Sequence, residues 1–125
     1  MNRPVAGADG DVPVIAPMLT GDTRPVDLVT IRATADRALQ ERASVPRRAE
    51  VRELTSALHE HLVLLVEAAQ HRRDEAKGEA RRHWAAVLNR GQMDLARRGN
   101  TGQSAVQYLQ EIARTCRYLT DLLAR

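Results

Sequence analysis

The sequence contains no phenylalanine, and its only aromatic residues are Trp84, Tyr108 and Tyr118. A β-sandwich or β-barrel uses alternating β-branched and aromatic residues, so this scarcity argues against both. A single cysteine, Cys116, excludes a disulfide-stabilised scaffold. The longest apolar run, Leu62 to Val66, is too short to cross a membrane, and no secretory signal opens the chain. We therefore expect a cytoplasmic, all-α protein.

The 125 residues fit one domain, and their charge is nearly balanced, with 19 lysines and arginines against 16 acidic residues. Lys77 is the only lysine, so almost all of the positive charge comes from arginine. Residues 1–24 hold three of the five prolines and show no helical period. We expect them to form a largely irregular N-terminal arm, either a disordered leader or an extended segment laid over an apolar groove. Residues 25–125 are expected to form a helical bundle.

Apolar residues at spacings of three and four predict four helices within the bundle. The first is expected to begin between Pro25 and Leu28 and to end near residue 42, and the others to cover 46–77, 79–98 and 105–123. Short connections between them predict an antiparallel, up-down-up-down four-helix bundle. Gly78 is the only breaker between the second and third helices, so a three-helix variant results if the chain does not break there.

Individual residues refine these boundaries. Pro25 suits the first turn of the first helix, and Asp27 suits its N-cap. Gly91 lies inside the third helix, where glycine costs stability, and we attribute it to the close approach of a neighbouring helix. The segment Gly99 to Gly102 is expected to be a loop in which Thr101 caps the fourth helix.

The string from Leu54 to Leu65, LTSALHEHLVLL, resembles the long helix of a small actinobacterial, Streptomyces-type family of unknown function that is labelled as natural-product biosynthesis proteins. Four other features agree with it: Ile31 with Ala38 and Leu39, Pro46 before the second helix, Trp84, and the segment ARTCRYL over 113–119. The resemblance covers about residues 27–125. The chain departs from it in reading Val66-Glu67-Ala68 where the family has Pro-Glu-Val, and in having Gly78 as its break. The resemblance implies an all-α fold and a biosynthetic setting, and it supplies no catalytic residue.

His61 and Cys116 are the strongest candidates for chemistry. Each occupies an apolar seam, with Leu62 as the alternative to His61, and parallel second and fourth helices would place both at a similar height. An adjacent imidazole can activate a cysteine nucleophile. The alternative is structural, because a cysteine on an apolar stripe usually behaves as a small hydrophobic residue and a buried histidine usually finds a hydrogen-bond partner.

The remaining histidines invite a metal interpretation. Glu60, Glu67 and His71 share one helix face, but this face lies opposite the apolar seam. Di-metal helical bundles use Glu-x-x-His motifs that point inward, which this pattern does not match. We expect neither a metal nor a cofactor.

Eight of the arginines form four adjacent pairs, at 47–48, 72–73, 81–82 and 97–98, each near an end of a predicted helix. Arg47, Arg48, Arg97 and Arg98 are expected to share one pole of the bundle and are candidates for anion contact. Nucleic-acid binding is disfavoured, because the net charge is only +3 and the pairs are divided between two poles.

These patterns favour a non-enzymatic accessory or regulatory protein-interaction module, linked to natural-product biosynthesis by the resemblance alone. Tyr108, Tyr118 and Leu122 do not all fit the seam of the fourth helix, and we expect them to form a second contact surface for a protein partner or a homodimer. The alternative is a small-molecule-binding bundle or small enzyme with an interhelical pocket near His61, Trp84 and Cys116.

Overall fold

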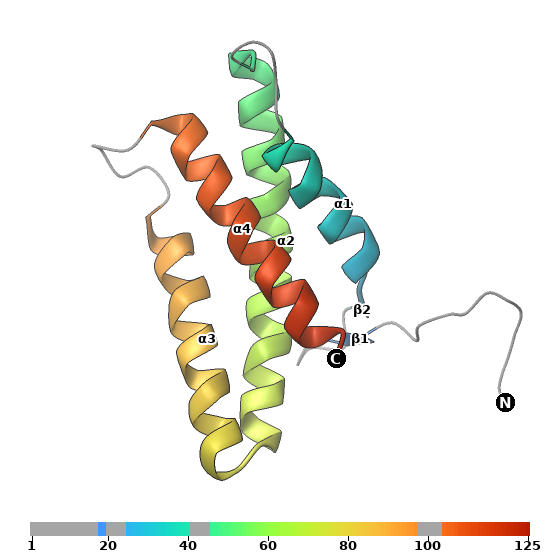
Figure 1. The fold of residues 1–125 in the computed structure, drawn as a ribbon, viewed down its shortest axis with the longest axis vertical. Coiled ribbons are helices and arrows are strands. Elements are labelled where there is room, and N and C mark those ends of the chain that lie inside the picture. The colour runs from blue at the N-terminus through green and yellow to red at the C-terminus, as the bar shows by residue number, and fades with distance from the viewer. Residues whose placement is uncertain (1–17, 20–24, 41–45, 98–103) are drawn as a thin grey trace, which may run out of the picture.

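The computed structural model describes residues 18–19, 25–40, 46–97 and 104–125, and these form an all-α bundle with one very short strand pair. The elements in chain order are β1 (Met18–Leu19), β2 (Pro25–Val26), α1 (Leu28–Leu39), α2 (Arg48–Glu75), α3 (Gly78–Ala96) and α4 (Ala105–Leu123). Successive helices run in opposite directions, with α2 and α4 parallel to each other (Figure 1). The predicted up-down-up-down four-helix bundle is confirmed.

The start of α1 differs in part from the prediction. Asp27 is the N-cap, and its carboxylate accepts hydrogen bonds from the backbone N–H of Thr30 at 3.0 Å and from the Thr30 hydroxyl at 2.7 Å. The placement of Pro25 in the first helical turn was wrong, because Pro25 lies in β2 and pairs with Leu19 of β1. The next residue, Val26, is buried, so the chain joins the hydrophobic core one residue before the cap.

The core lies where α3 and α4 pack against the long helix α2 and where α1 packs mainly against α4. Leu58, Leu62 and Leu65 of α2 are fully buried, and Ile112 and Leu119 of α4 pack with them. The spacing of three and four residues puts these side chains on one face of each helix. Leu62, and not its neighbour His61, occupies the seam position that the sequence left open between them.

The helical hairpin α2–α3 breaks at the predicted glycine. Gly78 has a φ of +61°, a left-handed conformation that side-chain-bearing residues rarely adopt. The predicted close approach of a neighbouring helix at Gly91 is confirmed, because a Cβ placed on this glycine would lie 2.8 Å from Cγ2 of Val66. Glycine at position 91 therefore lets α3 approach α2 closely.

Helix α4 begins with a capping box that the sequence analysis missed. The Ser104 hydroxyl accepts from the backbone N–H of Gln107 at 3.0 Å, and the Gln107 side chain accepts from the Ser104 N–H at 3.1 Å. The N-cap is thus Ser104 and not Thr101, which was the predicted cap. The expected loop from Gly99 to Gly102, together with Arg98, lies outside the described residues, as do residues 1–17 and 20–24 of the expected arm.

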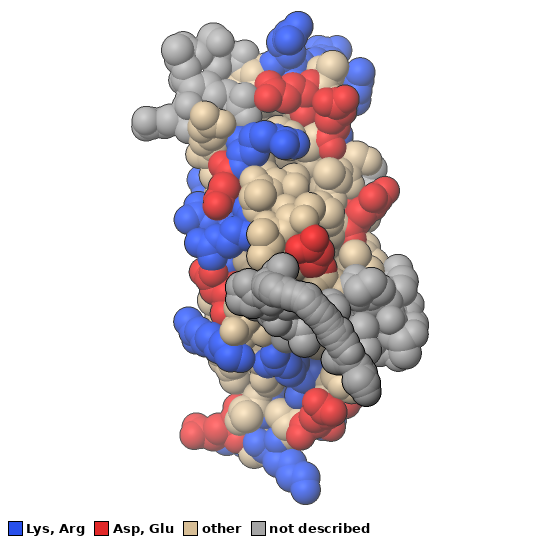
Figure 2. Space-filling model, turned by 90° about the vertical axis from the view of Figure 1, so that its right-hand side faces the viewer, with Lys and Arg blue, Asp and Glu red and all other residues tan. Residues whose placement is uncertain are grey.

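Ion pairs join the solvent side of α1 to α4. Arg32 pairs with Asp121, and Nε of Arg117 lies 3.2 Å from Oδ1 of Asp36. All four side chains are partly exposed, so these pairs fix the register of the two helices and add little to stability. Figure 2 shows basic and acidic side chains interleaved along the molecule on this side.

Candidate functional site

A groove of about 370 Å³ lies between α3 and α4. Helix α3 packs mainly on α2, whereas α4 lies between α1 and α2, so α3 and α4 are in limited contact with each other. The groove is lined by one stripe on each helix, at spacings of mostly three and four residues. The lining residues are Ala86, Asn89, Arg90, Met93, Asp94 and Arg97 on α3, and Glu111, Arg114 and Thr115 on α4.

The floor of the groove contains a buried carboxylate. Asp94 is only 6% exposed, and its Oδ2 accepts a hydrogen bond from the buried hydroxyl of Thr115. The Tyr108 hydroxyl donates to the backbone carbonyl of Asp94 at 3.1 Å. Nη1 of Arg97 lies 3.8 Å from Oδ1 of Asp94 and 2.6 Å from Oε1 of Glu111. Because a buried carboxylate is costly unless it is paired, these contacts stabilise the floor and join the end of α3 to α4.

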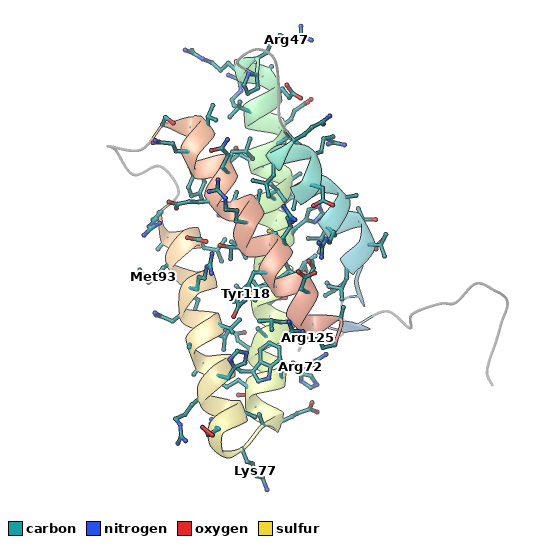
Figure 3. The ribbon with its side chains drawn as sticks, in the orientation of Figure 1. Arg47, Arg72, Lys77, Met93, Tyr118 and Arg125 are labelled. Atoms are coloured by element: carbon teal, nitrogen blue, oxygen red, sulfur yellow. The ribbon has the colours of Figure 1, made fainter. Side chains whose placement is uncertain are left out.

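The rim of the groove combines exposed apolar side chains with arginine. Met93 is 48% exposed, and Tyr118, one helical turn from Thr115, is 38% exposed. The guanidinium of Arg90 lies 5.2 Å from the centre of the Tyr118 ring, in cation–π contact. Figure 3 shows Tyr118 on the side of α4 that faces α3. Arg114 is exposed and, among the described residues, has no carboxylate within ion-pair distance.

Cys116 is buried and unreactive in character. Its thiol donates to the backbone carbonyl of Leu58 at 3.8 Å, which places Cys116 about one turn of α2 from His61, as the parallel helices predicted. Burial, together with the negative charge of Asp94, raises the pKa of the Cys116 thiol to about 12. The thiol therefore stays protonated near neutral pH, and a thiolate nucleophile is strongly disfavoured.

His61 lies half-buried on α2, outside the core seam. Burial lowers the pKa of its imidazole, and the negative charges of Glu60 and Asp27 partly oppose this effect. Its charged neighbours are thus on α2 itself and at the start of α1, and the half-exposed ring contrasts with the sealed position of Cys116.

Trp84 packs near the closed end of the α2–α3 hairpin. The guanidinium of Arg72 lies 5.4 Å from the centre of its ring, and the His83 ring contacts it edge-on at 5.9 Å between centroids. Arg72 also donates from Nη2 to the carbonyl of Leu123 at 2.9 Å (Figure 3). This chain of contacts joins α3, α2 and the last turn of α4, where a cation offsets the helix dipole.

His61, Trp84 and Cys116 do not line this groove, and the predicted pocket near these three residues stays a prediction. The prediction of a second contact surface was wrong for Tyr108 and Leu122, which are buried. Helix α4 contacts α1, α2 and α3, so it buries a wider arc than a single seam, and both residues fall within that arc. Tyr118 alone of the three is exposed.

The arginine pairs lie at different helix ends and differ in what they contact. Arg47 and Arg48 are exposed at the start of α2, where Arg47 is the N-cap without a side-chain hydrogen bond. Arg97 ends α3 and is held by Glu111, and its neighbour Arg98 is outside the described residues. Arg81 donates to the carbonyl of Arg73 at 3.2 Å and thereby caps the end of α2. Two of the pairs thus include an arginine that satisfies carbonyl groups at a helix end, Arg72 and Arg81.

The described part of the chain contains no group of three histidine, cysteine or acidic side chains arranged to hold a metal ion. None of the helices in it combines the length and the apolarity that a membrane span requires. The groove itself is the feature that the sequence analysis missed. Its signal was Asp94, which follows Val87 and Gly91 at the four-three spacing of a buried seam, where a carboxylate is unexpected.

A family model described as a family of unknown function matches residues 29–125. The match spans all four helices and agrees closely with the extent of the resemblance that the sequence predicted. The family's description names neither a source organism nor a biosynthetic role, so these parts of the resemblance stay predictions. No curated protein and no solved structure matches the chain.

Proposed function

We propose that the chain, which belongs to DUF6415, a family of unknown function, is a non-enzymatic protein-interaction module. It binds its partner at the groove between α3 and α4. Such a module acts by binding alone and catalyses no reaction itself. We therefore propose that the protein has an accessory or regulatory role.

The observation that supports this proposal most strongly is the composition of the rim. Met93 and Tyr118 are two of the three large apolar side chains that are exposed in the described residues, the third being Val29 on α1. Arg90 stacks on Tyr118 beside the groove. Methionine, tyrosine and arginine are enriched in protein interfaces, and tyrosine and arginine dominate their binding energy.

The state of the candidate reactive residues supports a non-enzymatic role. The thiol of Cys116 is buried and protonated, and it donates to a backbone carbonyl. Asp94 is engaged by Thr115 and Arg97 at the floor of the groove. A catalytic carboxylate or thiol needs a reachable, activated atom, and these groups are committed to the fold.

A second candidate is a small-molecule-binding bundle, favoured by the groove volume of about 370 Å³. This volume falls in the range of pockets that take a small organic ligand, roughly 300–1,000 Å³. The half-polar rim and its exposed side chains fit a protein surface better, because small-molecule pockets enclose most of their ligand. A ligand that co-purifies with the chain in place of a protein would favour this second candidate.

The setting of this function rests on the sequence resemblance alone. We propose a cytoplasmic role beside natural-product biosynthesis enzymes in an actinobacterium, with the partner encoded in a neighbouring gene. The identity of the genes that flank the coding sequence tests this directly: biosynthetic genes support it, and a setting without any contradicts it.

Co-purification from the organism that encodes the chain tests the binding face. An affinity-tagged wild-type chain should retain a partner protein, and Met93→Ser and Tyr118→Ser should each reduce its yield. Val29→Ser is the matched control, because Val29 is 70% exposed on a different helix. Equal partner yields from all four chains, or loss with Val29→Ser only, would contradict the proposed binding face.

A further inference from the structure

The charges around the groove do not cancel within the described residues. Glu111 and Asp94 both lie within ion-pair distance of Arg97, so one arginine and two carboxylates form a network with one negative charge in excess. Arg90 and Arg114 have no carboxylate partner among the described residues. The outer part of the groove therefore presents two guanidinium groups, one from each wall, that pair with no carboxylate of the described residues.

The two arginines differ in how they are held. The guanidinium of Arg90 lies 5.2 Å from the centre of the Tyr118 ring, and this cation–π contact favours one position of the side chain. Arg114, one turn after Glu111 on α4, is exposed. Because this contact already restricts the guanidinium of Arg90, the side chain loses little conformational entropy when it binds a carboxylate with two parallel hydrogen bonds.

A second copy of this chain is a poor occupant of the groove. A two-fold interface places the same surface of both copies against itself, so Arg90 and Arg114 of one copy would need carboxylates from this surface of the other. The acidic residues on the same surface, Asp94 and Glu111, are already engaged by Arg97 and Thr115. Like charges at an interface disfavour association.

A nucleic acid is disfavoured on the same surface. Phosphate backbones are bound by runs of basic residues, whereas here two arginines flank apolar Met93 and Tyr118.

We propose that the groove receives an acidic segment of a partner protein, in which carboxylate side chains alternate with apolar ones. Arg90 and Arg114 bind the carboxylates, and Met93 and Tyr118 contact the apolar side chains. The shape is that of a groove between two helices, which suits an amphipathic helix laid along it. This inference rests on the proposed function and specifies the chemistry of the partner.

The test uses the full chain and two fluorescein-labelled synthetic helical peptides. The first peptide is about four helical turns long and presents glutamate and leucine at spacings of three and four on one face. The second is identical except that glutamine replaces each glutamate. Fluorescence anisotropy at low ionic strength measures the Kd of each peptide for each variant.

The glutamate peptide should bind at least about tenfold more tightly than the glutamine peptide, and added salt should weaken it. Arg90→Gln and Arg114→Gln should each weaken its binding by roughly three- to tenfold, the range for a charge-assisted contact at a partly exposed site. Arg52→Gln and Arg82→Gln are matched controls, since both arginines are exposed on α2 and α3 outside the groove, and they should leave the Kd unchanged.

Three results would overturn the inference: no binding of the glutamate peptide, equal affinity for both peptides, or equal effects of the groove and control substitutions. A labelled DNA duplex that binds more tightly, with the same dependence on Arg90 and Arg114, would also overturn it. Its failure is distinguishable from failure of the proposed function. If the yield of the co-purified partner depends on Met93 and Tyr118 but not on Arg90 and Arg114, the proposed binding face is supported. The inference that the partner segment is acidic is then refuted.

Discussion

Replacing Gly91 with alanine tests the contact that positions the α3 wall of the groove. A Cβ at this position would lie 2.8 Å from Cγ2 of Val66, well inside the optimal carbon–carbon separation of about 3.5–4.0 Å. Overpacking of a core costs about 1–3 kcal/mol, whereas alanine in place of a helical glycine gains about 1 kcal/mol. We therefore expect Gly91→Ala to lower the free energy of unfolding by up to about 2 kcal/mol.

A double-mutant cycle with Val66→Ala isolates the steric part of this effect. Val66→Ala removes the Cγ2 atom, so Gly91→Ala in that background should instead raise the free energy of unfolding by up to about 1 kcal/mol. The coupling between the two substitutions is then about 1–3 kcal/mol in favour of the double variant. Urea unfolding followed by circular dichroism measures all four free energies.

Gly78→Ala is the matched control. Nothing lies within 4 Å of a Cβ at Gly78, but its φ of +61° is unfavourable for alanine. It should cost about 1–2 kcal/mol both in the wild-type chain and in the chain that carries Val66→Ala. If Gly91→Ala stabilises the wild-type chain and shows no coupling to Val66→Ala, the close approach of α3 to α2 is refuted.

Three further predictions concern single residues. The pKa of Cys116 is about 12, so at pH 8 its thiol should react with a thiol reagent only when the chain unfolds. Urea should therefore accelerate the labelling greatly. Rapid stoichiometric labelling of the folded chain would contradict this. Burial lowers the pKa of His61, so the stability that its neutral imidazole contributes is present above the unfolded pKa and is lost as the pH falls through the folded pKa. His61→Gln should therefore flatten the decline in unfolding free energy between about pH 7 and pH 5. An unchanged slope would count against this explanation. Ser104→Ala removes the capping box of α4 and should cost about 1 kcal/mol in urea unfolding, whereas Ser56→Ala, exposed within α2, should be close to neutral; equal effects would exclude the cap.

The helices and their order were predictable because their apolar residues repeat every three or four positions. Leu58, Leu62 and Leu65 illustrate this, since any helix with that pattern must bury one face. The two glycines were also predictable. Gly78 interrupts the longest periodic stretch, and Gly91 sits where a helix would otherwise carry a side chain.

The groove was not predictable, because it depends on how far apart two helices lie. Periodicity says which face of a helix is buried and does not say how widely α3 and α4 are separated. Tyr108 and Leu122 show the same limit: their burial follows from α4 touching three other helices, which no single-helix pattern contains. Asp94 carried a sequence signal, but its partners Thr115 and Arg97 depend on the packing of α4 against α3.

Site-specific photo-crosslinking in the organism that encodes the chain tests whether a partner protein binds in the groove between α3 and α4. A benzophenone amino acid replaces Met93 in one variant and Val29 in another, since both positions are exposed but only the first lines the groove. We expect a crosslinked partner protein from position 93, attached within an acidic segment, and none from position 29. Crosslinking from position 29 alone, or from both positions to the same extent, would contradict it.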